Sequence, residues 1–281
     1  LSGSVFGFDL AALGVSPEPI GGSFALDASA SAAGKGAYAA RIALDSIEIR
    51  NKHRTDRIRP TSVSLHTDSA ATRAEAASGD LSLTFSTPQS ADSLIAALTR
   101  SARTLAGQID AQSIDMEQLK PALPDFALRV SAGPDNILNS LLKSRKIAFD
   151  ALNAEGANCD SLPVSIRLRT EGLAYGNVVL DTVTADIRQN GKRLEYALGL
   201  ANAPGNLDNI ARAGLYGHLV RNTGQANLYQ RNRAGREGFR FGLDVTWTDS
   251  LVRASVTPPD PLFGFEPWTV NRGNYLAYRF D

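Results

Sequence analysis

The chain has 281 residues, and its 29 Lys and Arg balance 29 Asp and Glu, so its formal net charge is zero at pH 7. A nucleic-acid-binding domain needs a basic footprint, so this balance argues against a nucleic-acid partner. Hydrophobic residues make up 43% and charged residues 21%, which is typical of a folded chain. The longest apolar run, Leu94–Leu98, is too short for a membrane-spanning helix. The chain starts at Leu1 without a signal peptide, and we expect it to be a piece of a longer protein.

Alternation of apolar with small or polar residues is the dominant pattern. A period of two places successive side chains on opposite faces of a sheet, and one apolar face with one polar face is typical of an antiparallel sheet. The sequence therefore predicts a mainly β protein built as an antiparallel β-meander. The alternating runs are 38–44, 81–85, 126–130, 164–168, 194–200, 239–247 and 276–280.

Turn signals separate some of these runs. Gln189–Lys192 contains Asn-Gly, which accepts the positive φ of a type I′ hairpin. Asp-Ser or Asp-Thr recurs within Leu44–Ile47, Leu180–Val183 and Thr248–Leu251. These side chains bond their own backbone, so we predict three turns, with a decayed hairpin repeat as the alternative.

The middle of the chain has a helical spacing. Thr87-Pro88 predicts a helix start, apolar residues then recur with a helical period, and Gly107 predicts its end. We expect a short helix over 115–120 and another helix after Gly133-Pro134.

The predicted organisation is one β-meander in two segments, separated by a helical insert with one strand at 126–131. The first β segment covers 1–87, the helical insert 88–145, and the second β segment 146–281.

Catalytic signatures are scarce. Gly34–Ala39 fits a loose dinucleotide pattern, but neither a hydrophobic strand nor a helix frames it. The three histidines, His53, His66 and His218, have no metal-ligand spacing, and Cys159 is the only cysteine. We expect no enzyme activity, no cofactor and no metal, with Cys159 an inert thiol in a polar loop.

Two basic runs and an aromatic C-terminal region each have two interpretations. The basic runs are solvated strand faces, or they contact anionic lipid headgroups or an acidic partner. The aromatic residues are core, or they form a belt around a ligand. The residues are Lys52, His53, Arg54, Arg57 and Arg59, then Arg231, Arg233, Arg236 and Arg240, and the aromatics Phe263, Phe265, Trp268, Tyr275, Tyr278 and Phe280.

Several stretches of strand and turn resemble one family of Gram-negative envelope proteins. They are Tyr196–Ile210, Gly217–Leu219, Gly238–Gly242, Thr246–Ser250 and Pro267–Tyr275, with Ala132–Asn136 in the helical part. They resemble the TamB family, the translocation and assembly module protein of the AsmA-like group, and are most similar to its Bacteroidota branch. The likeness covers most of the chain, best over 126–281.

This resemblance implies an elongated, curved antiparallel meander that forms a U-shaped, β-taco-like apolar groove. It implies a periplasmic segment of a protein anchored in the inner membrane outside this chain. The groove would conduct phospholipid acyl chains between the inner and outer membranes. The alternative is a scaffold or chaperone module whose strand edges bind an outer-membrane barrel-assembly protein. The helical insert departs from a plain all-β groove.

The candidate lipid-binding residues are alternating apolar residues of three runs, because alternate residues of a strand share one face. They are Phe239, Phe241, Leu243, Val245 and Trp247, then Leu194, Tyr196 and Leu198, and Val164, Ile166 and Leu168.

Overall fold

The computed structural model describes residues 1–9, 11, 12, 14, 21–34, 36–50, 55–203, 210–257 and 260–280. It confirms the predicted fold class: the protein is mainly β, with 61% strand and 13% helix. The strands form one large, open antiparallel sheet of up to twenty strands, accompanied by three helices. The chain divides into two compact units, unit 1 (Leu1–Leu94 and Phe126–Ala154) and unit 2 (Ile95–Asp125 and Glu155–Asp281). Each unit is described by itself below.

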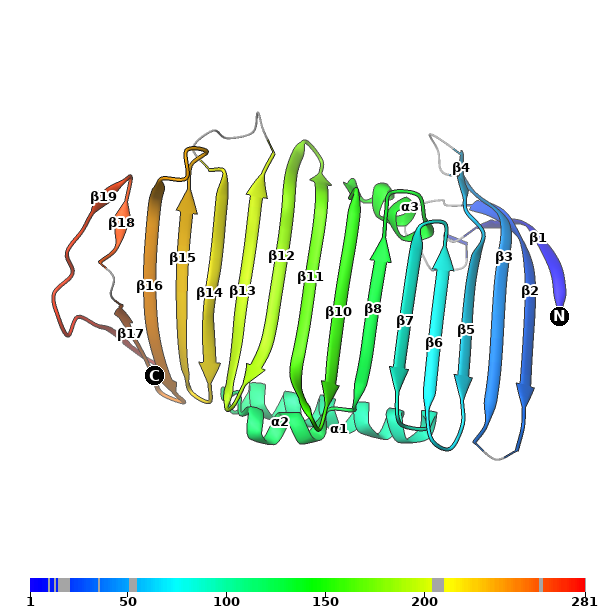
Figure 1. Cartoon of the computed structure of the whole chain (residues 1–281), viewed down its shortest axis with the longest axis horizontal. Coiled ribbons are helices and arrows are strands. Elements are labelled where there is room, and N and C mark those ends of the chain that lie inside the picture. The colour runs from blue at the N-terminus through cyan, green and yellow to red at the C-terminus, as the bar shows by residue number, and fades with distance from the viewer. Residues whose placement is uncertain are drawn as a thin grey trace. The chain divides into compact units, whose positions relative to one another are not determined.

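Unit 1 is an antiparallel meander with one helix (Figure 1). Consecutive strands pair in the order β1–β2–β3–β5–β6–β7–β8, and β4 pairs with the last residues of β3. The elements are β1 (Ser2–Asp9), β2 (Gly21–Ala32), β3 (Tyr38–Arg50), β4 (Thr55–Ile58), β5 (Thr61–Thr67), β6 (Thr72–Ser78), β7 (Leu81–Thr87), β8 (Phe126–Ala132), α3 (Ile137–Ser144) and β9 (Ile147–Ala148).

Unit 2 continues the same pattern, with strands paired in the order β11–β12–β13–β14–β15–β16–β17–β20. The short β18 pairs with the start of β16, and β19 pairs with β18. The elements are β11 (Leu162–Tyr175), β12 (Val178–Asn190), β13 (Arg193–Asn202), β14 (Arg212–Val220), β15 (Thr223–Arg231), β16 (Glu237–Thr248), β17 (Leu251–Val256), β18 (Leu262–Phe263), β19 (Glu266–Pro267), β20 (Leu276–Arg279) and α2 (Met116–Ala122). Two elements cross the boundary between the units, α1 (Ala91–Asp110) and β10 (Ala151–Cys159).

The predicted helices exist, but their first and last residues differ from the expectation. Thr87 is the buried last residue of β7, and Ser90 precedes α1, with its hydroxyl accepting from the Ser93 amide at 3.3 Å. Gly107 does not end α1, which continues to Asp110. The short helix α2 includes Pro121 rather than stopping before it. The third helix begins after Asn136, whose side chain caps it, three residues beyond Gly133.

Two of the three predicted Asp-Ser or Asp-Thr turns are irregularities inside strands. Ser46 lies within β3 with a φ of 52°, and the register of β12 shifts between Leu180 and Thr182. Only Asp249-Ser250 makes a hairpin turn, between β16 and β17. The Asn-Gly hairpin is also displaced by one residue. Asn190 pairs with Arg193, so Gly191 and Lys192 are the turn residues, and of the two only Gly191 has a positive φ.

Fully buried apolar side chains are few among the described residues: Ile47, Ile58, Ala97, Met116, Ala122, Ala132, Phe149 and Val164. The accessible surface of the chain is 17548 Å². A compact protein of 29.9 kDa exposes roughly 11,700 Å². The excess indicates that large parts of the sheet faces have no covering layer.

A buried polar network fastens α3 to the strand ends of unit 1. Asn139 is fully buried, donates to the carbonyl oxygens of Phe149 at 2.9 Å and Pro134 at 3.1 Å, and accepts from the Phe149 amide at 3.3 Å. Asn136 donates to the Asp80 carboxylate at 2.6 Å. These bonds satisfy backbone groups that would otherwise be buried without partners.

We predict that Asn139→Ala destabilises unit 1 by about 2–3 kcal/mol, because buried backbone groups of Phe149 and Pro134 lose their partner. Thermal or urea unfolding measures the change. Asn153→Ala, at an exposed position of β10, is the control and should change stability by less than about 0.5 kcal/mol. Equal stabilities for the two variants would contradict the role of Asn139.

Acid should weaken the same network. Burial raises the pKa of the Asp80 carboxyl, but hydrogen bonds from Asn136 and from backbone amides outweigh it, and the net pKa is lowered from 3.8. A lowered folded-state pKa contributes stability above the unfolded-state value, and that contribution is lost as the pH falls through the folded-state pKa. Asp80→Asn should therefore flatten the loss of stability below about pH 4, measured by unfolding at stepped pH. An unchanged acid slope would contradict this assignment.

Candidate functional site

Two unbroken ladders of apolar or small residues cross one face of unit 2. Each ladder is a series of directly paired residues from β11 to β16, so all its members share one face. We call this surface the apolar face of unit 2. One ladder is Ile166, Ile187, Tyr196, Gly217, Ala226 and Leu243, and the other is Leu168, Ala185, Leu198, Leu215, Leu228 and Phe241.

Large side chains on this face remain open to solvent. Ile166 is 46% exposed, Leu198 44% and Leu228 42%. Isolated exposed leucines are ordinary, but a contiguous exposed apolar patch marks an interaction surface. Neighbouring strands lie about 4.8 Å apart, so each six-strand ladder extends over roughly 24 Å.

Unit 1 has an apolar face of the same construction. Ile42 and Val63 are each 45% exposed, and Leu65 is 39% exposed. Its two ladders run from β2 to β8 and contain only alanine and larger apolar residues. They are Ala28, Ile42, Val63, Ala76, Leu83 and Val130, and Ala30, Ala40, Leu65, Ala74, Phe85 and Leu128.

All eleven candidate residues on β11, β13 and β16 lie on the apolar face of unit 2, by their strand pairings or by the alternation that continues those pairings. Val164 follows the same alternation but is buried, at 7% exposure. Two others also have structural contacts: the Tyr196 hydroxyl donates to the Gln225 carbonyl oxygen at 2.9 Å, and the Trp247 indole N–H donates to the Gln112 carbonyl oxygen. Burial raises the pKa of the Tyr196 phenol.

Sequence reasoning missed the contributions of β12, β14 and β15 to this face. Ile187, Leu215 and Leu228 complete the ladders. Alternation was visible there, but glycines interrupt it on β14, and Tyr216 and Tyr229 add aromatic residues to the opposite face.

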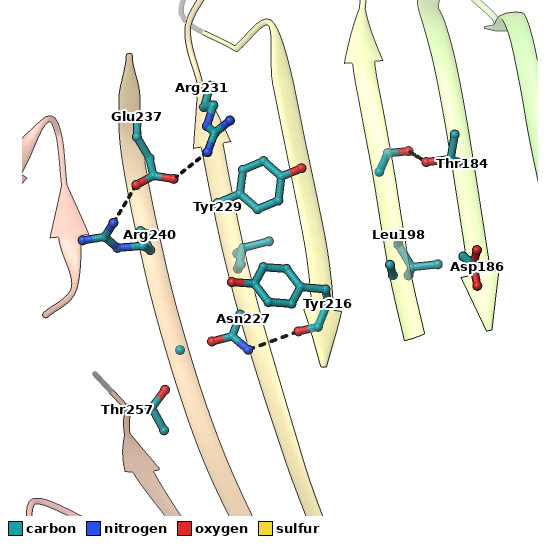
Figure 2. A pocket seen from close by; sticks show the side chains of 14 residues that line it. Thr184, Asp186, Leu198, Tyr216, Asn227, Tyr229, Arg231, Glu237, Arg240 and Thr257 are labelled. Carbon is teal, nitrogen blue, oxygen red and sulfur yellow. Dashed lines mark hydrogen bonds and ion pairs between the residues drawn. The ribbon is translucent and has the colours of Figure 1, made fainter. Parts of the chain in front are cut away.

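The opposite face of unit 2 is polar and contains a depression of about 620 Å³ (Figure 2). Tyr216 and Tyr229 lie on neighbouring strands there, with ring centroids 6.3 Å apart. Glu237 bonds Arg240 at 2.9 Å and Arg231 at 3.6 Å, as the dashed lines in Figure 2 show. The charged groups in this depression are therefore largely paired with one another across neighbouring strands.

Other charged pairs join neighbouring strands on the same polar face. Arg167 bonds Asp186 at 3.2 Å, and Arg188 bonds Glu195 at 2.9 Å. Hydrogen bonds from Asn190 and Arg188 lower the pKa of the Glu195 carboxyl. The polar face is thus a charged, hydrated surface, whereas the opposite face exposes aliphatic side chains such as Ile166, Leu198 and Leu228.

In the two basic runs named from the sequence, most of the described arginines contact an acidic side chain, an aromatic ring or a backbone carbonyl. Arg57 bonds Glu48 at 3.1 Å, and Arg59 bonds Asp135 at 2.7 Å. Arg236 lies over the Phe265 ring at 4.8 Å, and Arg233 donates to the Ala203 carbonyl at 2.7 Å. Lys52, His53 and Arg54, the tip of the first run, lie outside the described residues, as do 204–209 of the stretch that resembles the TamB family.

Some of the C-terminal aromatic side chains pack against other rings, and others are exposed to solvent. Phe263 contacts the rings of Phe239, Phe241 and Trp268 at centroid distances of 5.3–5.9 Å. Trp268 is 58% exposed and Tyr278 is 64% exposed.

The predicted absence of a metal site rests on sequence spacing. His66 is 4.0 Å from the Asp68 carboxylate, and His218 lies within β14. Within the described ranges, no three His, Cys, Asp or Glu side chains group as metal ligands would. Cys159 is the last residue of β10 rather than part of a loop, and a hydrogen bond with Ser161 lowers the pKa of its thiol.

The helices of unit 2 attach to the turns and ends of strands. Glu117 bonds Lys192 at 3.1 Å and Arg221 at 3.4 Å, and Lys120 donates to the Leu162 carbonyl at 3.1 Å. Lys192 and Arg221 lie in the hairpin connections β12–β13 and β14–β15. Between those ends Ile166, Leu198 and Leu228 remain more than 40% exposed, so the helical insert leaves this part of the apolar face of unit 2 uncovered.

Comparisons of this chain with protein-family models, curated proteins and solved structures give no match. None of the described helices combines the length and apolar character needed to cross a bilayer.

Gly217 lies in the first ladder at a position where a side chain does not fit. A Cβ there would lie 1.8 Å from the Gln225 carbonyl oxygen and 2.8 Å from the Tyr196 hydroxyl. We predict that Gly217→Ala destabilises the protein by about 1–3 kcal/mol, because the β14–β15 backbone must shift. Thermal unfolding measures the effect.

Gly107→Ala is the matched control, since the helical Gly107 has open space around its Cα. It should raise stability by about 0.5–1 kcal/mol through helix propensity. A neutral Gly217→Ala would show that β14 and β15 are farther apart than described.

Proposed function

We propose that the apolar faces bind the acyl chains of phospholipids, and that this chain is a periplasmic segment of a TamB-like protein that conducts lipid between inner and outer membranes. The observation that carries the proposal is the pair of uninterrupted apolar ladders in each unit, exposed on one face. The sequence resemblance to the TamB family supports the same function. The full-length protein would be anchored in the inner membrane outside this segment.

The energetics of lipid transfer favour such a surface. An acyl chain that leaves a membrane exposes apolar area worth about 0.8 kcal/mol per CH₂, so a two-chain lipid crossing water as a monomer faces a barrier on the order of 20 kcal/mol. A ladder of roughly 24 Å exceeds the thickness of one leaflet of the hydrocarbon core, about 15 Å. An extended acyl chain therefore fits along a ladder, with water kept to the polar face.

A second candidate function is a scaffold that pairs with outer-membrane proteins through a strand edge. It rests on β1, the first strand of unit 1, which pairs with β2 and where Phe6 is 84% exposed. An exposed edge offers unpaired backbone groups to another strand. The two functions differ in the contact that matters, side chains of the apolar face for lipid and backbone of an edge strand for a protein.

Leu198→Asp should abolish lipid binding while leaving the fold intact. Leu198 is 44% exposed, so the carboxylate stays hydrated in the empty protein but must be desolvated beside an acyl chain. We expect a melting temperature within a few degrees of the parent and loss of lipid photocrosslinking from a probe at position 228. Mass spectrometry of organic extracts measures co-purified phospholipid in parallel.

Ala197→Asp is the matched control, because Ala197 is the exposed neighbour on the polar face. It adds the same charge to the same strand and should leave crosslinking unchanged. Equal losses in both variants, or no lipid on the parent protein, would refute the lipid-binding function. The scaffold function would be favoured if no lipid were found on the protein and if blocking the β1 edge stopped it from binding an outer-membrane protein.

A further inference from the structure

The depression on the polar face of unit 2 is bordered by a row of residues from four neighbouring strands and the segment after β17. Tyr216 pairs directly with Asn227, and Asn227 pairs with Gly242. The Thr257 amide donates to the Gly242 carbonyl oxygen at 3.0 Å, which extends the row by one position. Paired residues share one face of a sheet, so these side chains line the same hollow. Its volume of about 620 Å³ is within the range of about 300–1,000 Å³ that small-molecule sites have.

The floor of the depression contains glycines at positions where a side chain would not fit. A Cβ at Gly242 would lie 2.3 Å from the Thr257 Oγ1 and 2.8 Å from the Asn227 Oδ1. A Cβ at Gly199 would lie 2.7 Å from the Thr184 Oγ1. Hydroxyl and amide oxygens of the neighbouring strands therefore take the space that a side chain would fill, and they border the depression.

Two buried polar atoms at this depression have no partner among the described residues. Thr257 is only 7% exposed, and its Oγ1 makes no hydrogen bond there. Figure 2 shows this oxygen directed toward the other labelled side chains. The Arg240 Nε is also unpartnered, while its other guanidinium nitrogens bond Glu237 at 2.9 Å and the Asp260 carbonyl oxygen at 3.4 Å. Buried polar atoms are normally hydrogen-bonded, so two unpaired ones at one depression indicate a ligand.

The charges of the depression favour an uncharged ligand. Its charged lining residues are two acidic and two basic, Asp186, Glu237, Arg231 and Arg240. Glu237 bonds both arginines, and Asp186 bonds Arg167. Strong binding of a phosphate or carboxylate depends on cations that are free to pair with it. Since both lining arginines already have an acidic partner, an anion gains little here.

The two tyrosine rings favour a sugar over a flat aromatic ligand. The rings of Tyr216 and Tyr229 lie with their centroids 6.3 Å apart and their planes tilted by 56°. A flat heterocycle stacks best between parallel rings, and these rings are not parallel. A puckered sugar ring packs its C–H groups against such tilted faces, and its hydroxyl groups both donate and accept hydrogen bonds. Those hydroxyls suit a hydroxyl and a guanidinium N–H that lack partners.

We propose that this depression is a binding site for an uncharged sugar. The sugar packs on the two tyrosine rings, and its hydroxyl groups bond the side chains of Asn227 and Thr257 and the Nε–H of Arg240. This function goes beyond lipid binding and does not rest on it, because the depression and the apolar ladders lie on opposite faces of the sheet.

A glycan array probed with the intact 281-residue chain tests the site. The array displays neutral and sulfated oligosaccharides on inert linkers, and the same neutral sugars as glycolipids. We expect binding to neutral sugars on the linkers. Binding to glycolipids alone would assign recognition to the acyl chains and overturn the proposal. Binding to sulfated sugars alone, or to no sugar, would also overturn it.

Calorimetry with the neutral oligosaccharide that binds best then locates the site. Tyr216→Ala should weaken binding at least about tenfold, because the sugar loses one of its two aromatic contacts. Tyr216 is 48% exposed, so the fold should persist, which circular dichroism checks. The matched control is Tyr175→Ala at the end of β11, which removes a 67% exposed tyrosine outside the depression and should leave binding unchanged. Equal affinities of the two variants would overturn the proposal.

Thr257→Val tests the unpartnered hydroxyl with a side chain of nearly the same shape. It should weaken binding by about three- to tenfold, the value of one hydrogen bond. Its melting temperature should not fall, because a buried hydroxyl without a partner is replaced by a methyl group. Thr257→Ser keeps the hydroxyl and should bind within about twofold of the parent. Parent-level binding by Thr257→Val would overturn the proposed contact, and so would a lowered melting temperature, which would assign the hydroxyl to the fold.

Discussion

The rest of the structure depends on a single-layer constraint: in each unit, the described side chains leave the apolar face of the sheet in contact with solvent. Apolar burial normally stabilises a sheet by packing it on a second layer. Here the stabilising contacts are backbone hydrogen bonds between long neighbouring strands, lateral contacts between side chains of one ladder, and small buried clusters at strand ends. The Asn139 network under α3 and the Ser101 and Gln108 contacts of α1 are such clusters.

The polar face complements this arrangement. Exposed pairs such as Arg188 with Glu195 each contribute little stability, because water and salt screen them and ordering two long side chains costs entropy. These pairs instead favour the correct register of the strands, because a strand that slipped by one residue would place its charged side chains among the ladder leucines. Binding of acyl chains would supply the second layer that the protein lacks, and so couple lipid loading to the stability of the sheet.

Local patterns in the sequence predicted the strands and the approximate positions of the helices, because period two and period 3.6 are properties of neighbouring residues. Helix starts were less accurate: Thr87 is a good capping residue, but it is the buried end of β7, and Ser90 caps instead. Asp45-Ser46 and Asp181-Thr182 have turn chemistry, yet they lie at irregular points within strands. The ladders depend on partners that can be dozens of residues apart, such as Leu83 with Val130, and no local pattern specifies that register. The sequence pattern does not predict the polar depression, because aromatic residues such as Tyr216 and Tyr229 are typical of a core as well as of a surface hollow.

The irregular points also bear on how such a chain changes during evolution. Inserting one residue in the middle of a regular strand exchanges the two faces beyond the insertion, whereas inserting two restores them. The register shift between Leu180 and Thr182 accommodates one extra residue of β12 relative to β13, at a point beyond both ladders. Gene lengthening within the strands is therefore restricted to steps of two codons unless a bulge arises with the insertion, while whole hairpins can be duplicated without affecting the parity of either face.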